Sequence, residues 1–423
     1  MNVRVSELVI EGSRRLDGEI NLQGAKNSIL PILASCIMCK GECIIHNCPH
    51  ISDVDVTIKV LNYLGCKTFF ENGTITVDSS NACKNDIPDF LMREMRSSII
   101  FLGALVSLAG KANLSLPGGC ELGPRPIDLH IDGLRQMGLN IIETHGVLKC
   151  EAVSKLRGCS IALSFPSVGA TENLILAAVL AKGTTVITNA AKEPEIMDLI
   201  NFLNKCGAKI SCFEGSTIII EGVDRLYPTE YTIISDRIVA ITYMAASAVT
   251  AGKLVLKNVL EETISSAIPI FEEAGCIIKV SKNDNILKLE APARPYFNRL
   301  IRTMPYPGFP TDAQAPVMAM TAIADGRSMF VENIFSDRYK HVGELLRLGA
   351  DIKVEDKVAI VDGVKRLSGA KVKAMDLRGA ASLVVAGLSA EGKTVITNLK
   401  HLDRGYEKIE ENLCNMGASV KRS

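Results

Sequence analysis

A glycine-bounded phrase that returns about every 70 residues constrains the fold of this chain more than any other feature. Each copy opens with a glycine and a run of strand-forming residues, and most of these runs end in asparagine, as in KGTTVITN at 182–189. A helical pattern follows and closes on a small-residue turn, as in KCGA at 205–208. The closing glycines stand at positions 65, 138, 207, 275, 349 and 417, which are 73, 69, 68, 74 and 68 residues apart. A repeated period of this kind indicates a repeat architecture, so the sequence predicts six similar units.

The order of patterns within a unit indicates an α/β fold. In the third unit, the glycine that caps the helix is followed by two strand patterns, GAKISCF at 207–213 and STIIIEG at 216–222. A second helical pattern precedes the next opening glycine, as in ATENLILAAVLAKG at 170–183. Six βαβαββ-like units would form two similar domains of three units each. The pattern is interrupted near 225–236, where we expect the boundary between the domains.

The composition excludes several classes of protein. Of the 423 residues, 47% are hydrophobic, so the chain can bury large cores. Basic and acidic residues number 47 each, which argues against a nucleic-acid or anionic-membrane binder. The N-terminus lacks the apolar core of a signal peptide, and the apolar run at 28–39 is too short to span a bilayer. We therefore expect a soluble, cytoplasmic protein.

Four cysteines lie close together in the sequence, at positions 36, 39, 43 and 48. One interpretation is a zinc or redox site. The other is that Cys36 and Cys39 share one face of an apolar helix and Cys43 lies in the following strand, all as buried thiols. The chain has no second close cysteine pair and no histidine pair at ligand spacing, which favours buried thiols and no metal.

The second unit departs from the repeat in the stretch PGGCELGPRPID at 117–128. Its prolines and glycines exclude a helix or a central strand, so we expect a long loop that carries Cys120. An arginine nearby, Arg125, can lower the pKa of such a thiol and make it a nucleophile or an acid. The alternative is a neutral surface insertion. Loops of this kind on a regular scaffold commonly carry function.

Other polar stretches interrupt the apolar patterns. Lys26 lies in LQGAKNS at the start of a helical pattern, where a cation and helix amides would form an anion site. Asp312 lies in YPGFPTDAQA, either as a helix N-terminal charge or as a carboxylate for base work. Four arginines occupy similar settings and are surface charges or parts of an anion-binding cleft: Arg96, Arg338, Arg378 and Arg404.

At these residues the sequence resembles the UDP-N-acetylglucosamine 1-carboxyvinyltransferases, a family of enolpyruvyl transferases. The matching motifs run through nearly the whole chain: GAKN at 24–27, PGGCxLGxRPxDLH at 117–130, SVGATEN at 167–173, EPEI at 193–196, YPGFPTD at 306–312, RYKHVGEL at 338–345 and HLDRGYEKIE at 401–410. The resemblance implies two inside-out α/β domains, each of three units. It implies a first domain over 21–234 that carries the Cys120 loop, a second domain formed by 1–20 and 235–423, and an active site in the cleft between them.

The resemblance also implies an activity: transfer of the enolpyruvyl group of phosphoenolpyruvate to the 3′-hydroxyl of UDP-N-acetylglucosamine, with release of phosphate and without a cofactor. By motif match the catalytic positions are Lys26, Cys120, Asp312 and Arg404. The positions expected to hold phosphoenolpyruvate are Lys26, Asn27, Arg96, Arg125, Arg338, Arg378 and Arg404. Those expected to hold the nucleotide sugar are Asn27, Arg96, Arg125, Pro126, Ile127, Asp128, Leu129, His130, Ser167, Val168, Gly169, Asp312, Ile334 and Phe335.

In this family the Cys120 position is the proton donor and the site alkylated by the epoxide fosfomycin, and the Asp312 position receives the proton of the sugar hydroxyl. The chain departs from some members at SFP before Ser167, where those members carry a lysine that reaches the nucleotide phosphates. Two alternatives stay open. One is an enolpyruvyl transferase that acts on shikimate 3-phosphate, a family that lacks the PGGC loop. The other is a non-catalytic sugar-nucleotide-binding paralogue.

Overall fold

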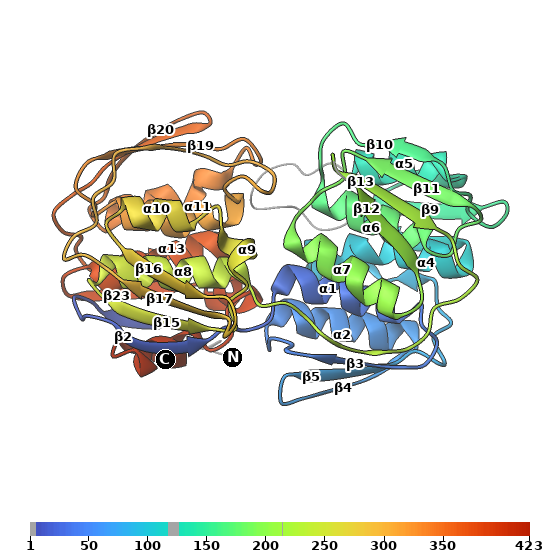
Figure 1. The fold of residues 1–423 in the computed structure, drawn as a ribbon, viewed down its shortest axis with the longest axis horizontal. Coiled ribbons are helices and arrows are strands. Elements are labelled where there is room, and N and C mark those ends of the chain that lie inside the picture. The colour runs from blue at the N-terminus through green and yellow to red at the C-terminus, as the bar shows by residue number, and fades with distance from the viewer. Residues whose placement is uncertain (1–5, 117–126, 214) are drawn as a thin grey trace. The chain divides into compact units, whose positions relative to one another are not determined.

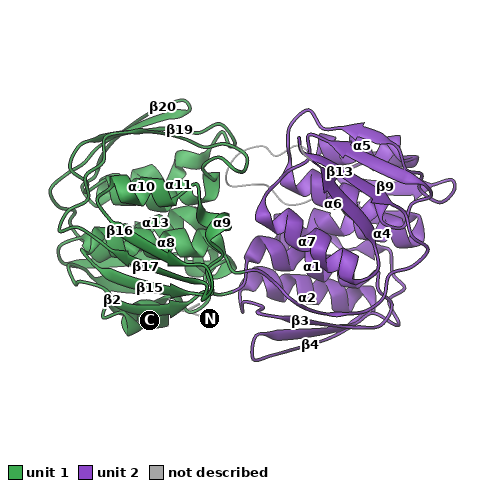
Figure 2. Ribbon diagram, viewed as in Figure 1, with its two compact units in different colours: residues 1–23, 121–123, 235–423 green, residues 24–120, 124–234 purple. Residues whose placement is uncertain are grey.

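The computed structural model describes residues 6–116, 127–213 and 215–423, which form two compact units. Unit 1 contains residues 6–23 and 235–423, and unit 2 contains residues 24–116 and 127–234 (Figure 2). Among the described residues, the chain passes between the units at Gln23–Gly24, where 20/21 was expected, and at Ile234–Ser235, where 234/235 was expected. In the part of the chain described, no helix combines the length and apolar character that a membrane crossing needs.

Each unit carries three four-stranded sheets, and all six sheets share one topology. The strand that follows the opening glycine pairs in parallel with one edge strand and antiparallel with an inner strand, which in turn pairs antiparallel with the other edge strand. This agreement confirms the six repeat units that the sequence predicts. Each of the two compact units contains three of them.

In unit 2 the sheets are, in strand order, β14 (Glu230–Thr232), β3 (Glu42–His46), β5 (Thr74–Asp78) and β4 (Lys67–Glu71); β6 (Asp86–Ile87), β7 (Lys111–Ser115), β9 (Val147–Ala152) and β8 (Leu139–Thr144); and β10 (Ser160–Ala162), β11 (Thr184–Thr188), β13 (Thr217–Glu221) and β12 (Lys209–Phe213). Its helices are α1 (Lys26–Cys36), α2 (Ser52–Leu64), α3 (Asp89–Glu94), the 3₁₀ turn η1 (Arg96–Ile100), α4 (Phe101–Ala109), α5 (Asp128–Gln136), α6 (Val168–Ala178) and α7 (Pro194–Lys205).

In unit 1 the sheets are β16 (Ile277–Ser281), β17 (Ile286–Glu290), β15 (Lys253–Lys257) and β2 (Asp17–Asn21); β18 (Leu300–Arg302), β19 (Arg327–Val331), β21 (Val358–Asp362) and β20 (Asp351–Glu355); and β22 (Lys371–Lys373), β23 (Lys393–Thr397), β1 (Leu8–Glu11) and β24 (Ser419–Arg422). Its helices are α8 (Arg237–Val249), α9 (Glu261–Ile264), α10 (Ile268–Glu273), α11 (Thr311–Thr321), η2 (Arg338–His341), α12 (Val342–Arg347), α13 (Leu377–Ser389), η3 (Leu399–Arg404) and α14 (Ile409–Asn415).

Helices form the centre of each unit and the sheets lie outside them, as Figure 1 shows. In unit 1 the helices α8, α11 and α13 pack against one another, and every residue of α8 is buried. In unit 2 the helix α4 packs against α1 and α6. A helix that is apolar on all sides belongs in a core, because no face of it gains from contact with water. This arrangement is the inside-out α/β fold that the resemblance implied.

The repeated glycines and asparagines have a conformational cause. The six closing glycines adopt left-handed backbone with φ between 90° and 103°, a region that a β-carbon disfavours. Four of the asparagines that end the opening strands, Asn47, Asn189, Asn258 and Asn398, also have positive φ, from 54° to 65°. Asparagine tolerates this backbone better than most other residues. The sequence repeat is therefore a repeat of left-handed turns.

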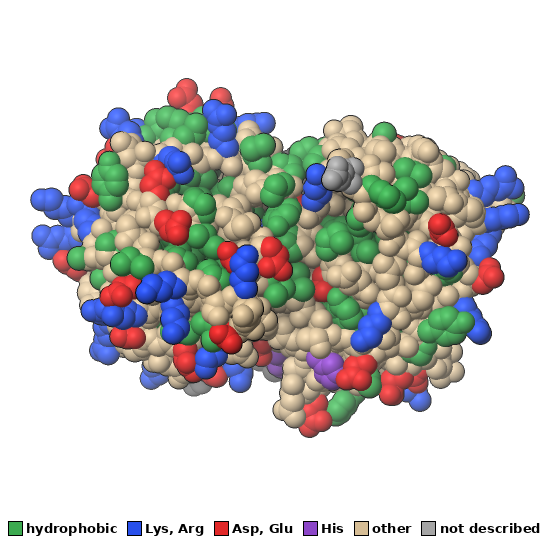
Figure 3. Space-filling model, viewed as in Figure 1, with side chains coloured by type: hydrophobic (Ala, Val, Ile, Leu, Met, Phe, Trp, Pro, Cys, Tyr) green, Lys and Arg blue, Asp and Glu red, His purple; other side chains and the backbone are tan. Residues whose placement is uncertain are grey.

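The surface carries both signs of charge. On the face drawn in Figure 3, the Lys and Arg side chains are interspersed with Asp and Glu on each unit. This distribution agrees with the balance of 47 basic and 47 acidic residues.

Candidate functional site

Lys26 is the first residue of α1, where the sequence predicted a cation beside helix amides. Its Nζ lies 2.8 Å from Asp53 Oδ2, and both side chains are buried, with 9% and 2% of their surface exposed. Asp53 lies in the first turn of α2. The carboxylate offsets the cost of burying the ammonium group. Asn27 follows Lys26 in the first turn of α1 and is half-buried.

A second group of predicted residues lies around the starts of α5 and α6. His130 is buried in α5, and its Nδ1 lies 2.9 Å from Asn173 Nδ2. The amide of Asn173 is oriented by its oxygen, which accepts a hydrogen bond from the N–H of Gly103 at 2.7 Å. Since Asn173 Nδ2 can only donate, His130 Nδ1 accepts and Nε2 carries the proton. Burial and the charge of Arg96 lower the pKa of His130 to about 4, although Asp128 raises it, so the ring is neutral at pH 7.

Ser167 begins α6 as its cap, and its hydroxyl accepts a hydrogen bond from the N–H of Ala170 at 3.4 Å. Val168 and Gly169 lie in the first turn of α6. The backbone N–H groups of a first turn point out of the helix start, where they can donate to a bound group. A β-carbon at Gly169 would lie 3.2 Å from His130 Cε1, so glycine allows the close packing of α5 on α6. The predicted residues of 127–130 and 167–169 therefore come together.

Packing connects the two groups within unit 2. Helix α6 contacts both α5 and η1, which begins with Arg96, and η1 contacts α1, which begins with Lys26. The structure thus collects the described part of the predicted unit 2 set around the starts of α1, α5, α6 and η1.

Asp312 is the second residue of α11 in unit 1, at the helix entrance that the sequence predicted. Two arginines hold its carboxylate. Arg338 Nη2 donates to Oδ1 at 3.0 Å, and Arg378 donates to Oδ2 from Nη2 at 3.0 Å and from Nε at 3.2 Å. Both guanidinium groups are almost completely buried, with 1% and 3% of their side-chain surfaces exposed, while Asp312 keeps 28%. The two arginines are therefore interior charges rather than surface ones.

The Arg378 guanidinium has a second partner, the Tyr406 hydroxyl, which accepts from Nη1 at 3.3 Å. That hydroxyl also lies 2.9 Å from Thr242 Oγ1 on α8. Burial alone would lower the pKa of Arg378, but the negative charge of Asp312 raises it strongly, and its guanidinium stays charged. A chain of hydrogen bonds thus connects α8, the loop after η3, α13 and α11.

Arg404 is the last residue of η3, which packs against α13. The loop that follows it is held by Gln23, whose side-chain amide donates to the carbonyl of Gly405 at 3.0 Å and accepts from the N–H of Glu407 at 2.9 Å. Ile334 and Phe335 lie before η2, and the Arg338 guanidinium lies 5.7 Å from the centre of the Phe335 ring. Unit 1 thus gathers its predicted residues around α11, α13 and the two 3₁₀ turns.

Three predicted residues, Cys120, Arg125 and Pro126, lie outside the described residues. The sequence reasoning missed Asp53, Asn173 and Tyr406. Asn173 and Tyr406 stand inside quoted motifs, SVGATEN and HLDRGYEKIE, and that was the available signal. Asp53 lies outside every motif, and only the fold places it beside Lys26.

The four clustered cysteines are all buried. Cys36 ends α1, Cys43 lies in β3, and Cys39 lies in the turn between them rather than on the helix. The Sγ atoms of Cys39 and Cys206 are 3.7 Å apart, and both residues are buried. Burial raises the pKa of Cys48 and that of Cys66 to about 12. Among the described residues no group of histidine, cysteine and carboxylate side chains is arranged to hold a metal ion.

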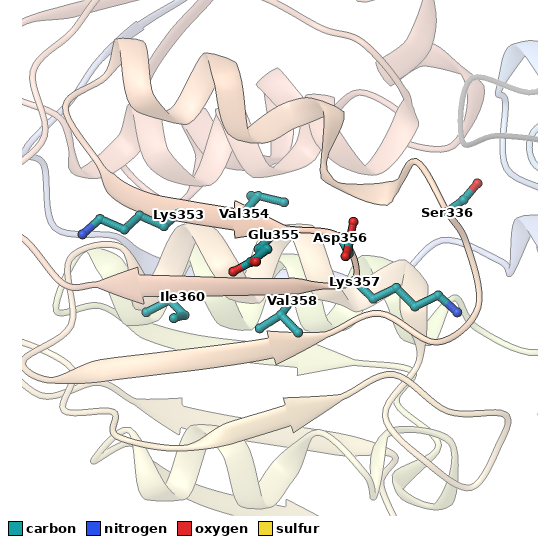
Figure 4. Close-up of a pocket in the computed structure, with 8 residues that line it drawn as sticks. All are labelled: Ser336, Lys353, Val354, Glu355, Asp356, Lys357, Val358 and Ile360. Carbon is teal, nitrogen blue, oxygen red and sulfur yellow. The ribbon is translucent and has the colours of Figure 1, made fainter.

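One groove in unit 1 lies apart from these residues. It is lined by the hairpin of β20 and β21 together with Ser336, as Figure 4 shows, and none of the predicted residues lines it. The polar residues that line this groove are mixed in charge: Lys353, Glu355, Asp356 and Lys357. It offers no converging cations for a small anionic substrate.

Comparison with known proteins decides the family. The family model described as EPSP synthase (3-phosphoshikimate 1-carboxyvinyltransferase) matches residues 10–413. A UDP-N-acetylglucosamine 1-carboxyvinyltransferase 2 of Caldanaerobacter subterraneus is 51% identical over 413 residues, which cover 98% of each chain. The chain belongs to the UDP-N-acetylglucosamine 1-carboxyvinyltransferase family.

Other members of that family and related structures agree. UDP-N-acetylglucosamine 1-carboxyvinyltransferase 1 of Clostridium acetobutylicum is 44% identical, over 99% of this chain and 100% of its own. The crystal structure of the enolpyruvyl transferase NikO from Streptomyces tendae has a TM-score of 0.89 and 25% identity, over 99% of both chains. The EPSP synthase of Acinetobacter baumannii shares the fold, with a TM-score of 0.75 at 19% identity, over 99% of this chain and 100% of its own.

Proposed function

We propose that the chain transfers the enolpyruvyl group of phosphoenolpyruvate to the 3′-hydroxyl of UDP-N-acetylglucosamine and releases phosphate, the first committed step of peptidoglycan synthesis. The observation that carries the proposal is the 51% identity, over nearly the whole chain, to a relative with that name. Both substrates are intracellular metabolites, so the proposal places the reaction in the cytoplasm.

The reaction makes three demands on the protein. A proton must be added to the vinyl carbon C3 while the sugar oxygen bonds to C2, and the hydroxyl proton must pass to a base. The tetrahedral intermediate then loses phosphate from C2 and a proton from C3, which restores the double bond. The anionic groups of phosphoenolpyruvate must be held by cations throughout. A proton donor, a base and a set of cations are therefore required.

We assign Cys120 as the proton donor and Asp312 as the group that receives the hydroxyl proton, both by motif position. Lys26, Arg125 and Arg404 are the cations proposed for phosphoenolpyruvate, with Asn27 beside them. Support for Lys26 comes from its place in the first turn of α1, where helix amides add to its charge.

We assign the nucleotide sugar to the residues around the starts of α5 and α6, together with Arg96, Asp312, Ile334 and Phe335. The amide N–H groups at the start of α6 suit an anionic or carbonyl oxygen. Arg338 and Arg378 are proposed to act near phosphoenolpyruvate, and their contacts with Asp312 place them beside the proposed base. We further propose that the residues of the two units act on the same pair of substrates.

A phosphate-release assay with phosphoenolpyruvate and UDP-N-acetylglucosamine tests this proposal. We expect turnover only when both substrates are present, and loss of turnover in Cys120→Ala. Shikimate 3-phosphate in place of the nucleotide sugar should give no phosphate. If wild-type protein released phosphate with shikimate 3-phosphate and not with the nucleotide sugar, the assignment of the acceptor would be wrong. Absence of turnover with either acceptor would favour a non-catalytic binding protein.

A further inference from the structure

Glu332 breaks the repeat in the fifth of the six repeat units, directly after β19. Counted from the opening glycine, the sixth residue is asparagine in four units: Asn47, Asn189, Asn258 and Asn398. In the fifth unit, counted from Gly326, the sixth residue is Glu332, and the asparagine comes one position later as Asn333. The fifth repeat unit thus has one residue more than these four between its opening glycine and its asparagine.

The extra residue is Glu332 rather than Asn333, because Asn333 makes the contact that the asparagines make elsewhere. Its Nδ2 donates to the carbonyl of Thr303, just beyond the parallel edge strand, at 3.1 Å. Asn189 and Asn398 make the equivalent hydrogen bonds, at 2.8 Å each, to Leu163 and Ala374. The hydrogen bond that the asparagine makes in the other repeat units therefore forms here without Glu332.

The Glu332 carboxylate lies inside the unit, with 1% of the residue exposed, and accepts hydrogen bonds from two segments. Its Oε1 accepts from the backbone N–H of Ile334 at 2.8 Å and of Phe335 at 3.1 Å. Its Oε2 accepts from the hydroxyl of Thr311 at 3.0 Å. A buried carboxylate is tolerated when several donors satisfy it, and here three do so.

These two segments are the ones that unit 1 is proposed to offer to the nucleotide sugar. Ile334 and Phe335 form one of them. Thr311 precedes Asp312 in the first turn of α11, and Arg338 holds the same turn by donating to the Thr311 carbonyl at 2.8 Å. The cap position of α11 is Pro310, which makes no side-chain cap hydrogen bond. Glu332 thus connects the loop of 334–335 by hydrogen bonds to Thr311, the first residue of α11. The residue at the cap position of α11 supplies no such side-chain hydrogen bond.

We propose that Glu332 is a positioning residue that fixes the separation between Asp312 and the loop of Ile334 and Phe335, and so sets the affinity for the nucleotide sugar. The inference rests on the proposed function, since it deepens the role of the same site. A long ligand that contacts two protein segments binds tightly only when the distance between those segments is fixed. A displacement of about 1 Å can cost a large share of the affinity or the rate.

Two substitutions of Glu332 and one of its partner test the role. Glu332→Ala removes all three hydrogen bonds, and we expect the KM for UDP-N-acetylglucosamine to rise about tenfold or more. The KM for phosphoenolpyruvate should stay within about twofold, since Lys26 and Arg404 keep their contacts. Glu332→Gln can accept from both N–H groups and donate to Thr311, so it should recover most of the affinity. Thr311→Val removes only the connection to α11 and should give an intermediate effect.

Direct binding of UDP-N-acetylglucosamine, measured by titration calorimetry without phosphoenolpyruvate, gives a readout that does not depend on turnover. Glu355→Ala, an exposed carboxylate on β20 of the same sheet, is the matched control and should bind as the wild type does. If Glu332→Ala does not fold, Thr311→Val and Glu332→Gln give the answer.

The outcomes separate the two proposals. A wild type that neither binds nor turns over the nucleotide sugar overturns the proposed function and this inference with it. A wild type that does both, while the folded Glu332→Ala or Thr311→Val variant binds the nucleotide sugar as tightly, overturns this inference alone. Equal rises in both KM values with a matching loss of thermal stability would show a merely structural role, and would also overturn it.

Discussion

Arg378 donates two hydrogen bonds to one carboxylate oxygen of Asp312, from Nε at 3.2 Å and from Nη2 at 3.0 Å. The other oxygen of that carboxylate accepts from Arg338. Two buried arginines therefore hold both oxygens of the group that we propose as the acceptor of a proton. This arrangement fixes the direction of the carboxylate before the sugar hydroxyl arrives.

Asp312→Asn should lower kcat by about 100-fold or more, because an amide does not accept the hydroxyl proton. It should also lower the free energy of unfolding by about 3 kcal/mol, since two buried arginines lose their counter-charge. Phosphate release and thermal denaturation measure the two effects. Asp325→Asn, on an exposed carboxylate that pairs with Arg294 at 3.5 Å, is the control and should change neither quantity. A kcat near that of the wild type in Asp312→Asn would exclude Asp312 as the base.

Fosfomycin should alkylate Cys120 and no other cysteine. The thiolate opens the epoxide by forming a carbon–sulfur bond, and the ring oxygen takes up a proton, so the peptide gains the full mass of the reagent. The buried thiol of Cys48, whose pKa burial raises to about 12, supplies too little thiolate to compete. Peptide mass spectrometry identifies the modified residue. We expect faster labelling in the presence of UDP-N-acetylglucosamine, and a mass gain on a different cysteine would contradict the assignment.

The pKa of His130 predicts how stability depends on pH. Burial and Arg96 lower this pKa from 6.5 to about 4 in the folded chain. Between these values the unfolded chain binds a proton that the folded chain does not, so stability falls as the pH falls from about 6.5 to about 4. The loss reaches about 1.4 kcal/mol per pH unit for one such group.

Thermal denaturation across this pH range provides the measurement. His130→Gln should show a smaller loss of Tm on acidification than the wild type, because glutamine does not titrate. His145→Gln, at an exposed turn residue between β8 and β9, should follow the wild type. Equal acid sensitivity in His130→Gln and the wild type would mean that His130 does not contribute to it.

Alanine substitutions at two glycines distinguish the cost of a left-handed backbone from the cost of a steric clash. Gly138 closes the helix of the second unit with φ 95°, and a β-carbon there would meet nothing within 4 Å. Gly138→Ala should therefore cost only the left-handed backbone, about 1 kcal/mol. A β-carbon at Gly222 would lie 1.8 Å from the carbonyl oxygen of Ala181, so Gly222→Ala should cost several times more. Equilibrium unfolding of both variants checks this order, and a larger loss in Gly138→Ala would contradict it.

The repeat could be predicted from the sequence because it depends on left-handed backbone turns. Glycine and asparagine are the residue types that favour such turns, so their positions indicate where the turns lie. Each closing glycine occupies a left-handed turn, and that requirement is visible without any knowledge of neighbours. The starts of α1 and α11 were predicted for a similar reason, since Lys26 follows the Gly-Ala of LQGAKNS and Asp312 follows the prolines and glycine of YPGFPT.

The buried partners could not be predicted in the same way. Asp53 lies 27 positions after Lys26 in the sequence, and Tyr406 lies 28 positions after Arg378. Their polar atoms meet only because helices α1 and α2, and helix α13 and the loop after η3, pack side by side. A pattern of single residues shows where a charge stands, but the partner that neutralises it is decided by packing.

The strand β1 comes from the beginning of the sequence and lies between β23 and β24, which come from its other end. Glu7 and Ser423 exchange two backbone hydrogen bonds, at 3.0 and 2.9 Å. During synthesis, the continuous stretch that forms unit 2 is complete before β23 and β24 are made, so β1 stays without its two neighbouring strands until then. Unit 1 thus completes its sheets only after the residues of unit 2 have been synthesised.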